Sequence, residues 1–434
     1  MILTGIVNQQ SATNIMPFTH PFSRVLCPFC FEYFHLGQAP ERVVSSSALV
    51  NDPVVQEFLR LPSGSEALMP PVEEQTGFFN KLMRYFYFPA LHNGKVTKHR
   101  ICPHCHMKLP VQLGNNGMTS NIIAVTGYRD SGKSNFFGVL INELKNRYSL
   151  EVGLNLITQE TFSTSAMRSV FSDELYNERY GADLLGDNPQ VVRATLSAQT
   201  NSDIRIPLIY RLNLTRFSKR QRWLHPFASH RPIDLVLFDA AGEDMSSPEM
   251  LSLYCRYISR AAGIIALIDP LSYPEIRSEI KMNYNSTSYQ NRPYDTMGVL
   301  TQTIESSGQR NSTQKIKTPL AVTISKFDLL RNIEGLDPSV FEDHVHSSGF
   351  DSLAADKTSD AIRKFLIGKR INSIPTVVEN NYKTYKYFGM SALGRSPHPD
   401  RTLTSIEPIN IADSLFWILN QLGYLQTEEE MKSK

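Results

Sequence analysis

From residue 121 onward, short apolar runs alternate with amphipathic stretches. The apolar runs predict strands and the amphipathic stretches predict helices. The predicted strands are 121–126, 206–214, 233–239, 263–269, 319–325 and 383–389, and the predicted helices are 134–147, 163–180, 247–260, 358–370 and 409–422. Such alternation is typical of an α/β fold whose mainly parallel sheet is covered by helices on both faces. Strands 206–214 and 233–239 follow each other without a predicted helix, which favours an antiparallel hairpin.

Local signals indicate where two of these helices begin or end, whereas two polar segments have more than one interpretation. Ser247 is a suitable cap for helix 247–260, which has Pro248 at its first position, and Gly423 is a suitable stop for the last helix. Residues 271–317 are rich in Ser, Asn, Gln and Thr, which predicts a mobile loop with a short helix, and 331–357 look similar. Each is either a partner-facing insertion or a plain loop.

Bulk properties restrict the class of protein only broadly. The 434 residues predict two or three domains, and a net charge of +2 selects no partner. We expect a cysteine-bearing module at 1–118 ending in the linker 113–120, a nucleotide-binding domain at 119–425 and a tail at 426–434. The sequence shows neither a membrane-length apolar run nor the pattern of a signal peptide, so it predicts a cytoplasmic protein.

The segment GYRDSGKS at 127–134 fits the phosphate-binding pattern G-x-x-x-x-G-K-[ST]. It lies between a predicted strand and a predicted helix, where backbone N–H groups and the helix N-terminus favour phosphate. Lys133 would reach the β- and γ-phosphates, and the Ser134 hydroxyl would bind Mg²⁺. A chance turn is the alternative. The predicted phosphate-binding residues are Gly127, Asp130, Ser131, Gly132, Lys133, Ser134 and Asn135.

A carboxylate follows the apolar run 234–238. Asp239 at that strand end would support the Mg²⁺ ion, and Gly242, three residues later, would bring its N–H to the γ-phosphate. This D-x-x-G spacing is typical of switches, because the glycine contact is lost after hydrolysis.

Two further strand ends indicate the base. Strand 319–325 leads into Ser325-Lys-Phe-Asp328, and strand 383–389 leads into Met390-Ser-Ala-Leu393. An aspartate at 328 would accept from guanine N1–H and N2–H₂, a donor pair that adenine lacks. The stem of Lys326 would pack along the base. Together these segments favour guanine over adenine.

The motifs GYRDSGKS, DAAGE, SKFD and SAL resemble those of the Ras-like and translation-factor class of P-loop GTPases, over roughly residues 119–425. The resemblance implies GTP and Mg²⁺ as cofactors, with Ser391 and Ala392 at guanine O6. The long insertions and the cysteine module are similar to the double-GTPases of bacterial conflict gene clusters, which implies a defence role and a protein partner.

Departures from the GTPase pattern affect hydrolysis. Glu243 stands where Ras-type enzymes have glutamine, so slow turnover is expected, assisted by Glu243 or by a partner residue. Arg129 is either an internal arginine finger or an exposed loop residue, and Asp130 replaces the asparagine of potassium-activated GTPases. Thr195 or Thr200 is the expected switch ligand of Mg²⁺, ahead of Thr161 and Thr164, with a surface threonine as the alternative for each.

Two C-P-x-C knuckles predict a structural zinc site, with a redox pair or free thiols as the alternative. Their ligands would be Cys27, Cys30, Cys102 and Cys105. The long separation between the knuckles requires an insertion, approximately 38–95, which we expect to be helical. Its aromatic–basic stretch 78–88 is either a buried amphipathic helix or a base-stacking surface. We expect Cys255 to be a small core residue.

The segment 204–233 contains Arg and Lys and no acidic residue before Asp234. It is either a solvated basic turn or a surface for an acidic protein or a nucleic acid. The sequence as a whole predicts a GTP-binding switch with slow Mg²⁺-dependent hydrolysis and a zinc ribbon for partner contact. The alternatives are a nucleotide-binding scaffold that does not hydrolyse, and an ATP-dependent nucleic-acid factor.

Overall fold

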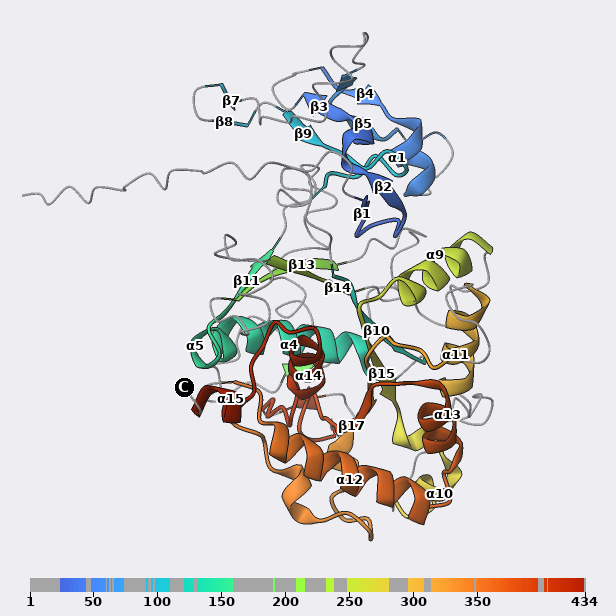
Figure 1. Ribbon diagram of the computed structural model, residues 1–434, viewed down its shortest axis with the longest axis vertical. Coiled ribbons are helices and arrows are strands. Elements are labelled where there is room, and N and C mark those ends of the chain that lie inside the picture. The colour runs from blue at the N-terminus through green and yellow to red at the C-terminus, as the bar shows by residue number, and fades with distance from the viewer. Residues whose placement is uncertain are drawn as a thin grey trace, which may run out of the picture.

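The fold was analysed in a computed structural model of the chain. The structure describes residues 24–43, 48–59, 61, 64, 66–73, 91–92, 95–96, 98–109, 121–128, 131–158, 190–191, 208–214, 232–237, 248–280, 296–307, 314–346, 349–396, 402–403 and 405–432. Figure 1 shows a cysteine-bearing module at the amino-terminal end above a larger α/β domain.

A parallel sheet forms the centre of the larger domain, with the strand order β10-β15-β16-β17. Its strands are β10 (Ile123–Gly127), β15 (Gly263–Ile268), β16 (Leu320–Ile324) and β17 (Tyr385–Gly389). Every residue of β15 and β16 is buried. Continuous apolar runs of this kind are what a strand covered on both faces requires. The prediction of these four strands is confirmed within two residues at either end.

An antiparallel sheet in the order β11-β13-β14 extends the domain on the side of β10. It consists of β11 (Leu154–Thr158), β13 (Leu208–Leu214) and β14 (Pro232–Leu237). β13 pairs antiparallel with β14, with Ile209 opposite Val236, so the predicted pairing of these two strands is confirmed. β14 lies beside β10 (Figure 1). β11 was not predicted from the sequence.

Helices cover both faces of the parallel sheet, as the alternating pattern predicted. Ile265 and Leu267 of β15 pack with α4 (Lys133–Asn146), α5 (Tyr148–Glu151) and α14 (Asp413–Gln421). Ile264 and Ala266 point to the opposite face. There they join a second core with α9 (Pro248–Ser259), α11 (Thr296–Ser306), α12 (Ser352–Gly368) and α13 (Ser373–Asn381). The twofold alternation of strand side chains therefore builds two cores from one sheet.

Some predicted boundaries change for identifiable reasons. α12 begins six residues before predicted position 358, because the Asp351 carboxylate accepts from Ala354 N at 3.0 Å and caps it there. α11 lies in the polar segment 271–317, and α13 was not predicted. The predicted stop at Gly423 is confirmed: it has φ +79°, and Tyr424 N donates to Leu419 O at 2.8 Å. Helix 163–180 and Ser247 lie outside the described residues.

Short elements complete the α/β domain. They are η4 (Pro270–Ser272), α10 (Pro274–Arg277), η6 (Phe327–Leu330), η7 (Pro338–Phe341) and α15 (Glu428–Lys432), with the strand pair β12 (Gln190–Val191) and β18 (Thr402–Leu403). Within the part of the chain that the structure describes, no helix combines the length and apolar character needed to span a membrane.

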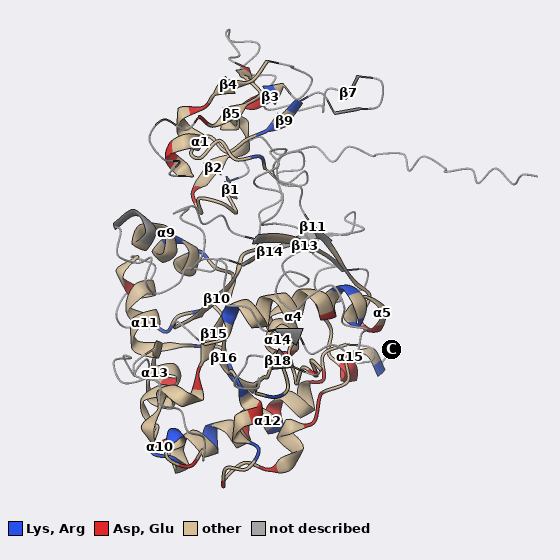
Figure 2. Ribbon diagram, turned by 180° about the vertical axis from the view of Figure 1, so that it is seen from behind, with Lys and Arg blue, Asp and Glu red and all other residues tan. Residues whose placement is uncertain are grey.

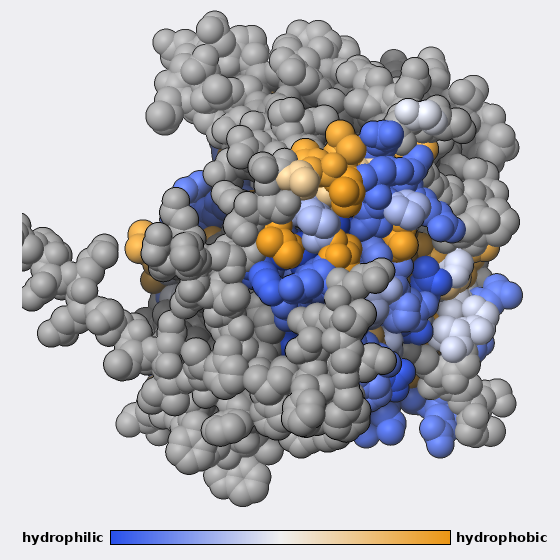
Figure 3. All heavy atoms as spheres, turned by 90° about the horizontal axis from the view of Figure 1, so that it is seen from above, coloured by the Kyte–Doolittle hydropathy of each residue, from blue (hydrophilic) through white to orange (hydrophobic). Residues whose placement is uncertain are grey.

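In its described residues, the cysteine module contains short strands and short helical segments. Its elements are β1 (Arg24–Leu26), β2 (Tyr33–His35), η1 (Leu36–Gln38), β3 (Glu41–Val43), β4 (Val50–Asn51), α1 (Pro53–Phe58), β5 (Leu68–Met69), β6 (Val72–Glu73), β7 (Leu91–His92), β8 (Lys95–Val96) and β9 (Lys98–Arg100). The aromatic stretch 78–88 lies outside the described residues. Seen from above, this end of the molecule has apolar side chains bordered by polar ones (Figure 3), and Leu49, Val50 and Leu68 are exposed in the module.

A buried ionic group fastens the insertion to the second knuckle. Asp52 accepts from Val54 N and Val55 N at the start of α1, pairs with Arg42, and lies 2.9 Å from His106 Nδ1. Burial opposes the charged carboxylate, but hydrogen bonds from His106 and Arg42 bring the pKa of Asp52 below its usual value. The insertion and the second knuckle, which follows it along the chain, are therefore joined through Asp52.

A second buried ionic group joins helix α14 to the loop before α12. His344 Nδ1 lies 2.5 Å from Asp413 Oδ2, and His346 Nε2 lies 2.9 Å from Asp413 Oδ1. Burial disfavours the charged form of His344, but the hydrogen bond to Asp413 and the negative charges of Asp413, Asp351 and Asp343 raise its pKa. Burial likewise disfavours charged Asp413, whereas hydrogen bonds from the two histidines lower its pKa.

The raised pKa of His344 predicts that the stability of the protein depends on pH. A raised folded-state pKa means that the contribution of His344 is complete below its unfolded pKa of about 6.5, and is lost as pH rises through the folded value. We expect the thermal midpoint of the protein to fall between about pH 6 and pH 9 by more than that of a His344→Gln variant. Parallel pH profiles for the two proteins in a thermal melt would contradict this assignment.

Close packing of α14 on the sheet predicts a cost for one small substitution. A Cβ on Gly263 would lie 2.4 Å from Ile418 Cγ2, which has no free space in the core. Gly263→Ala should lower the free energy of unfolding by about 1–3 kcal/mol through overpacking. The matched control is Gly368→Ala at the end of α12, where a Cβ meets no atom within 4 Å. Urea denaturation followed by fluorescence of buried Trp417 measures both, and an equal effect would contradict the packing argument.

Candidate functional site

The carboxyl ends of the four parallel strands meet at one edge of the sheet. Gly127 lies opposite Leu267, Ile268 lies opposite Ile324, and Ile324 lies opposite Gly389. The turns that follow these strands therefore leave the sheet side by side. Adjacent strands are about 4.8 Å apart, so β10 and β16 are separated by about 10 Å. The predicted phosphate-binding loop and the SKFD and SAL segments consequently share one edge.

The described part of the phosphate-binding loop presents a helix N-terminus and a lysine. Gly132 takes the left-handed conformation with φ +85° and is the N-cap residue of α4, so the N-cap position itself supplies no side-chain hydrogen bond to the first turn. Lys133 Nζ donates to Gly127 O at 2.8 Å and to Tyr128 O at 3.2 Å. The loop that is predicted to bind a phosphate therefore also holds the ammonium group of Lys133. The helix N-terminus adds positive potential at the same place.

Ser131 provides an independent test of whether this loop suits a phosphate. Its Oγ is buried and has no hydrogen-bond partner within the described structure. A Cβ on Gly127 would lie 2.5 Å from this oxygen and 2.8 Å from Leu267 O, so only glycine fits there. A buried hydroxyl without a partner is costly unless a ligand supplies one. The residues present therefore fit a phosphate oxygen.

The base-side segments are hydrogen-bonded to each other. Ser391 Oγ donates to Asp328 Oδ1 at 2.6 Å and accepts from Gly394 N at 2.9 Å. Phe327 N donates to Met390 O at 3.1 Å, which joins the SKFD turn to the SAL turn. The carboxylate of Asp328 is half-buried and fixed in orientation before any ligand arrives. A pre-oriented carboxylate can accept two parallel N–H bonds at a low entropic cost.

Sequence reasoning missed Asp269 in this part of the site. Asp269 follows β15 and is 1% exposed, and its Oδ2 accepts from Lys326 Nζ at 2.9 Å while its Oδ1 accepts from Leu271 N at 3.0 Å. It therefore positions the side chain of Lys326. The available signal was an acidic residue directly after a fully apolar run. Ser325, the first residue of the SKFD turn, donates from its hydroxyl to Ile268 O at 3.1 Å, which connects this turn to β15.

Part of the predicted site lies outside the described residues. The structure brings to one edge the residues of α4 and of the SKFD and SAL turns. The predicted residues outside the description are Asp130, Thr195, Thr200, Asp239, Gly242 and Glu243, together with Arg129. β14, the strand predicted to lead to Asp239, ends at Leu237.

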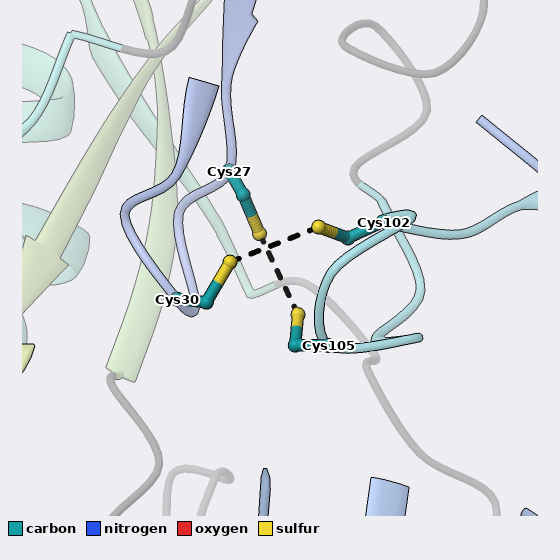
Figure 4. Close-up of side chains that lie close together, drawn as sticks. All are labelled: Cys27, Cys30, Cys102 and Cys105. Carbon is teal, nitrogen blue, oxygen red and sulfur yellow. Dashed lines mark hydrogen bonds between the residues drawn. The ribbon is translucent and has the colours of Figure 1, made fainter. Parts of the chain in front are cut away.

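The four predicted cysteine ligands converge in the amino-terminal module (Figure 4). All four Sγ atoms lie within 4.8 Å of one another, with Cys27 Sγ 3.8 Å from Cys105 Sγ and Cys30 Sγ 3.7 Å from Cys102 Sγ. Four sulfurs around a tetrahedral Zn²⁺ at about 2.3 Å would be about 3.8 Å apart. The cluster therefore fits a structural zinc ion.

The two knuckles have matching geometry. Phe29 N donates to Cys27 Sγ, and His104 N donates to Cys102 Sγ, each at 3.4 Å. Such N–H bonds to sulfur stabilise metal-bound thiolates. The residue after each second cysteine is left-handed, with φ 59° at Phe31 and 54° at His106. Burial raises the pKa of the Cys27 and Cys105 thiols, so a cation is needed to hold four thiolates together.

Two kinds of comparison with known proteins give matches. No protein-family model matches the chain. Over 435 residues the chain is 27% identical to "Putative ESX-1 scaffolding and assembly protein SaeC" of Mycolicibacterium smegmatis (strain ATCC 700084 / mc(2)155), covering 92% of this chain and 99% of that protein.

Similar solved structures include GTPase domains. The GTP-bound GTPase-like domain of S. cerevisiae Ski7 aligns with TM-score 0.31 and 12% identity, over 72% of this chain and 52% of that one. The small GTPase Arl6 BBS3 of Trypanosoma brucei aligns with TM-score 0.25 and 11% identity, over 70% of this chain and 97% of that one.

The cysteine geometry predicts the metal content of two variants. The purified protein should contain about one zinc per chain, and Cys30→Ser should lose it, because three sulfurs leave the tetrahedron incomplete. The matched control is Cys255→Ser, since Cys255 is half-buried on α9 and lies outside the cluster. Atomic absorption after gel filtration measures both. Zinc retained by Cys30→Ser, or lost from Cys255→Ser, would contradict the assignment.

Proposed function

We propose that this protein is a guanine-nucleotide-binding switch that uses Mg²⁺, hydrolyses GTP slowly and recruits a protein partner. One observation carries the proposal: the phosphate-binding loop with Lys133 and the hydrogen-bonded Asp328–Ser391 pair leave the same edge of one parallel sheet. In open α/β sheets, ligands bind outside the carboxyl ends of the strands. A nucleotide with its phosphates at α4 and its base at Asp328 would follow this edge.

Guanine is the base that suits the described groups. The Asp328 carboxylate would accept from N1–H and the exocyclic amine, since Ser391 already fixes its orientation. Asp269 holds Lys326 so that its stem can cover one face of the base. Backbone N–H groups at Ser391 and Ala392 are the proposed donors to guanine O6. Adenine would present an unprotonated N1 to the carboxylate, leaving two acceptors facing each other.

The proposed hydrolytic residues act on the phosphates. Lys133 would neutralise charge between the β- and γ-phosphates, and Ser134 with Asp239 would hold Mg²⁺, with Thr195 or Thr200 completing its shell. Gly242 would bind the γ-phosphate through its N–H, and Glu243 would orient water. A carboxylate beside a charged phosphate is a poor substitute for glutamine, so intrinsic turnover is proposed to be slow.

The partner is proposed to be a protein in an assembly process. The 27% identity to a protein named for ESX-1 scaffolding and assembly extends over 92% of this chain, which supports a recruiting role more than a defence role. In the described elements, basic and acidic residues lie side by side (Figure 2), so these elements do not favour a nucleic acid; most of the basic segment 204–233 lies outside them.

The same similarity favours a second candidate, a scaffold that binds guanine nucleotide without hydrolysing it. Lys133→Ala separates the two candidates. Phosphate release from GTP that is abolished by Lys133→Ala supports a switch, whereas binding without any lysine-dependent release supports a scaffold.

Base recognition gives the most specific prediction of this site. Asp328→Asn should lower affinity for GDP by about 100-fold or more and raise affinity for xanthosine diphosphate, because the amide can donate to the xanthine 2-oxo group. The matched control is Asp356→Asn, since Asp356 is an exposed acid on α12. Titrations with fluorescent GDP, ADP and xanthosine diphosphate measure the change. Tighter binding of ADP than GDP by the wild type would overturn the proposal.

A further inference from the structure

Helix α9 lies between the two candidate sites (Figure 1). One side of α9 contacts the first cysteine knuckle, and the other side contacts strands β10 and β14. β10 leads into the phosphate-binding loop at Gly127. The helix is therefore placed to respond to both a metal and a nucleotide.

Two arginines bind the knuckle where its backbone turns back. Arg256 Nε donates to Cys30 O at 3.2 Å, and Arg260 Nη1 donates to Phe31 O. Glu32 pairs with both, at 2.7 Å from Arg260 and 3.4 Å from Arg256. These carbonyls belong to the left-handed turn at the second cysteine of the knuckle. The arginines therefore bind the part of the backbone whose conformation metal binding would fix.

Aromatic packing continues the contact into the core. The Phe31 and Tyr257 rings have centroids 5.1 Å apart, and both side chains are fully buried. Arg260 also lies over the Tyr33 ring, 5.1 Å from its centroid. The knuckle and α9 belong to the same hydrophobic cluster as Ile264 of β15. The cysteine module therefore shares a core with the α/β domain.

The inner side of α9 is bonded to the strand that leads into the phosphate-binding loop. Tyr257 OH accepts from Val125 N at 2.8 Å and donates to Val236 O at 3.1 Å. Tyr254 OH bonds to Thr126 Oγ1, next to Gly127. One tyrosine thus contacts Phe31 of the knuckle with its ring, and β10 and β14 with its hydroxyl.

We propose that α9 couples the metal site of the cysteine module to the phosphate-binding end of the sheet, through Phe31 and Tyr257. This inference depends on the proposed guanine-nucleotide function for one of its two ligands. Metal binding fixes the knuckle and, through it, the position of α9, and bound nucleotide fixes α9 from the other side. Because coupling between two sites is reciprocal, the nucleotide slows metal release and the metal increases nucleotide affinity.

The main test is zinc release into excess chelator, followed with a colorimetric zinc indicator, with and without saturating Mg²⁺ and GDP. GDP should slow release from the wild type by about fivefold or more. Tyr257→Phe keeps the ring against Phe31 and removes the bonds to Val125 and Val236, so its release without GDP should match the wild type and its response to GDP should disappear. Glu32→Ala should release zinc faster and respond less to GDP.

The matched control is Asp356→Ala, which removes the exposed pair that joins Lys386 of β17 to α12 and should respond to GDP like the wild type. If the wild type binds GDP in a direct titration but releases zinc at the same rate with and without it, the coupling is overturned and the proposed function stands. A full response in Tyr257→Phe would also overturn it, because the tyrosine would then be ordinary core packing.

Hydrogen exchange at the Val125 amide tests the coupling without any nucleotide. Chelation of zinc from the wild type should speed exchange at this amide by about tenfold, because its acceptor is Tyr257 OH. Unchanged exchange after complete zinc removal would overturn the inference even in a protein that binds no GDP. A wild type without measurable GDP affinity would instead contradict the proposed function, and this exchange measurement would still decide the coupling.

Discussion

The parallel pairing of β10, β15, β16 and β17 is the constraint on which the candidate site depends. Backbone hydrogen bonds fix the register, so the residue after each strand end emerges at the same edge. The interior of the sheet is mainly apolar, with Thr126 and Thr323 as buried polar residues, and charged side chains follow the ends of the strands. Lys133, Asp269, Asp328 and Ser391 all lie beyond such ends, although they are spread over more than half of the chain.

Much of this edge could be predicted from sequence, because its signals are local. A glycine-rich turn between a strand and a helix, an S-K-x-D turn after an apolar run, and two C-P-x-C pairs each carry their chemistry within a few residues. Asp269 is different: its role becomes visible only when β15 and β16 are neighbours and Lys326 reaches across. The cap at Asp351 was missed because polar residues around it looked like a loop.

Long-range packing accounts for what sequence reasoning could not reach. Glu32 and Arg260 meet across 228 positions, and nothing in either segment alone indicates the other. A small module with short strands has little core of its own, so metal ligation and docking onto a larger domain are both expected to stabilise it. Here the docking surface is α9, whose other side is hydrogen-bonded to β10 and β14. The same helix therefore stabilises the cysteine module and positions β10, the strand that leads into the phosphate-binding loop.

The most direct measurement of the central claim is a crystal structure of the protein with Mg²⁺ and GDP. We predict one nucleotide along the carboxyl edge of the parallel sheet, with Lys133 Nζ at the β-phosphate and the Asp328 carboxylate at guanine N1 and N2. A nucleotide bound away from this edge, or one whose phosphates contact Lys133 while its base lies far from Asp328, would contradict it.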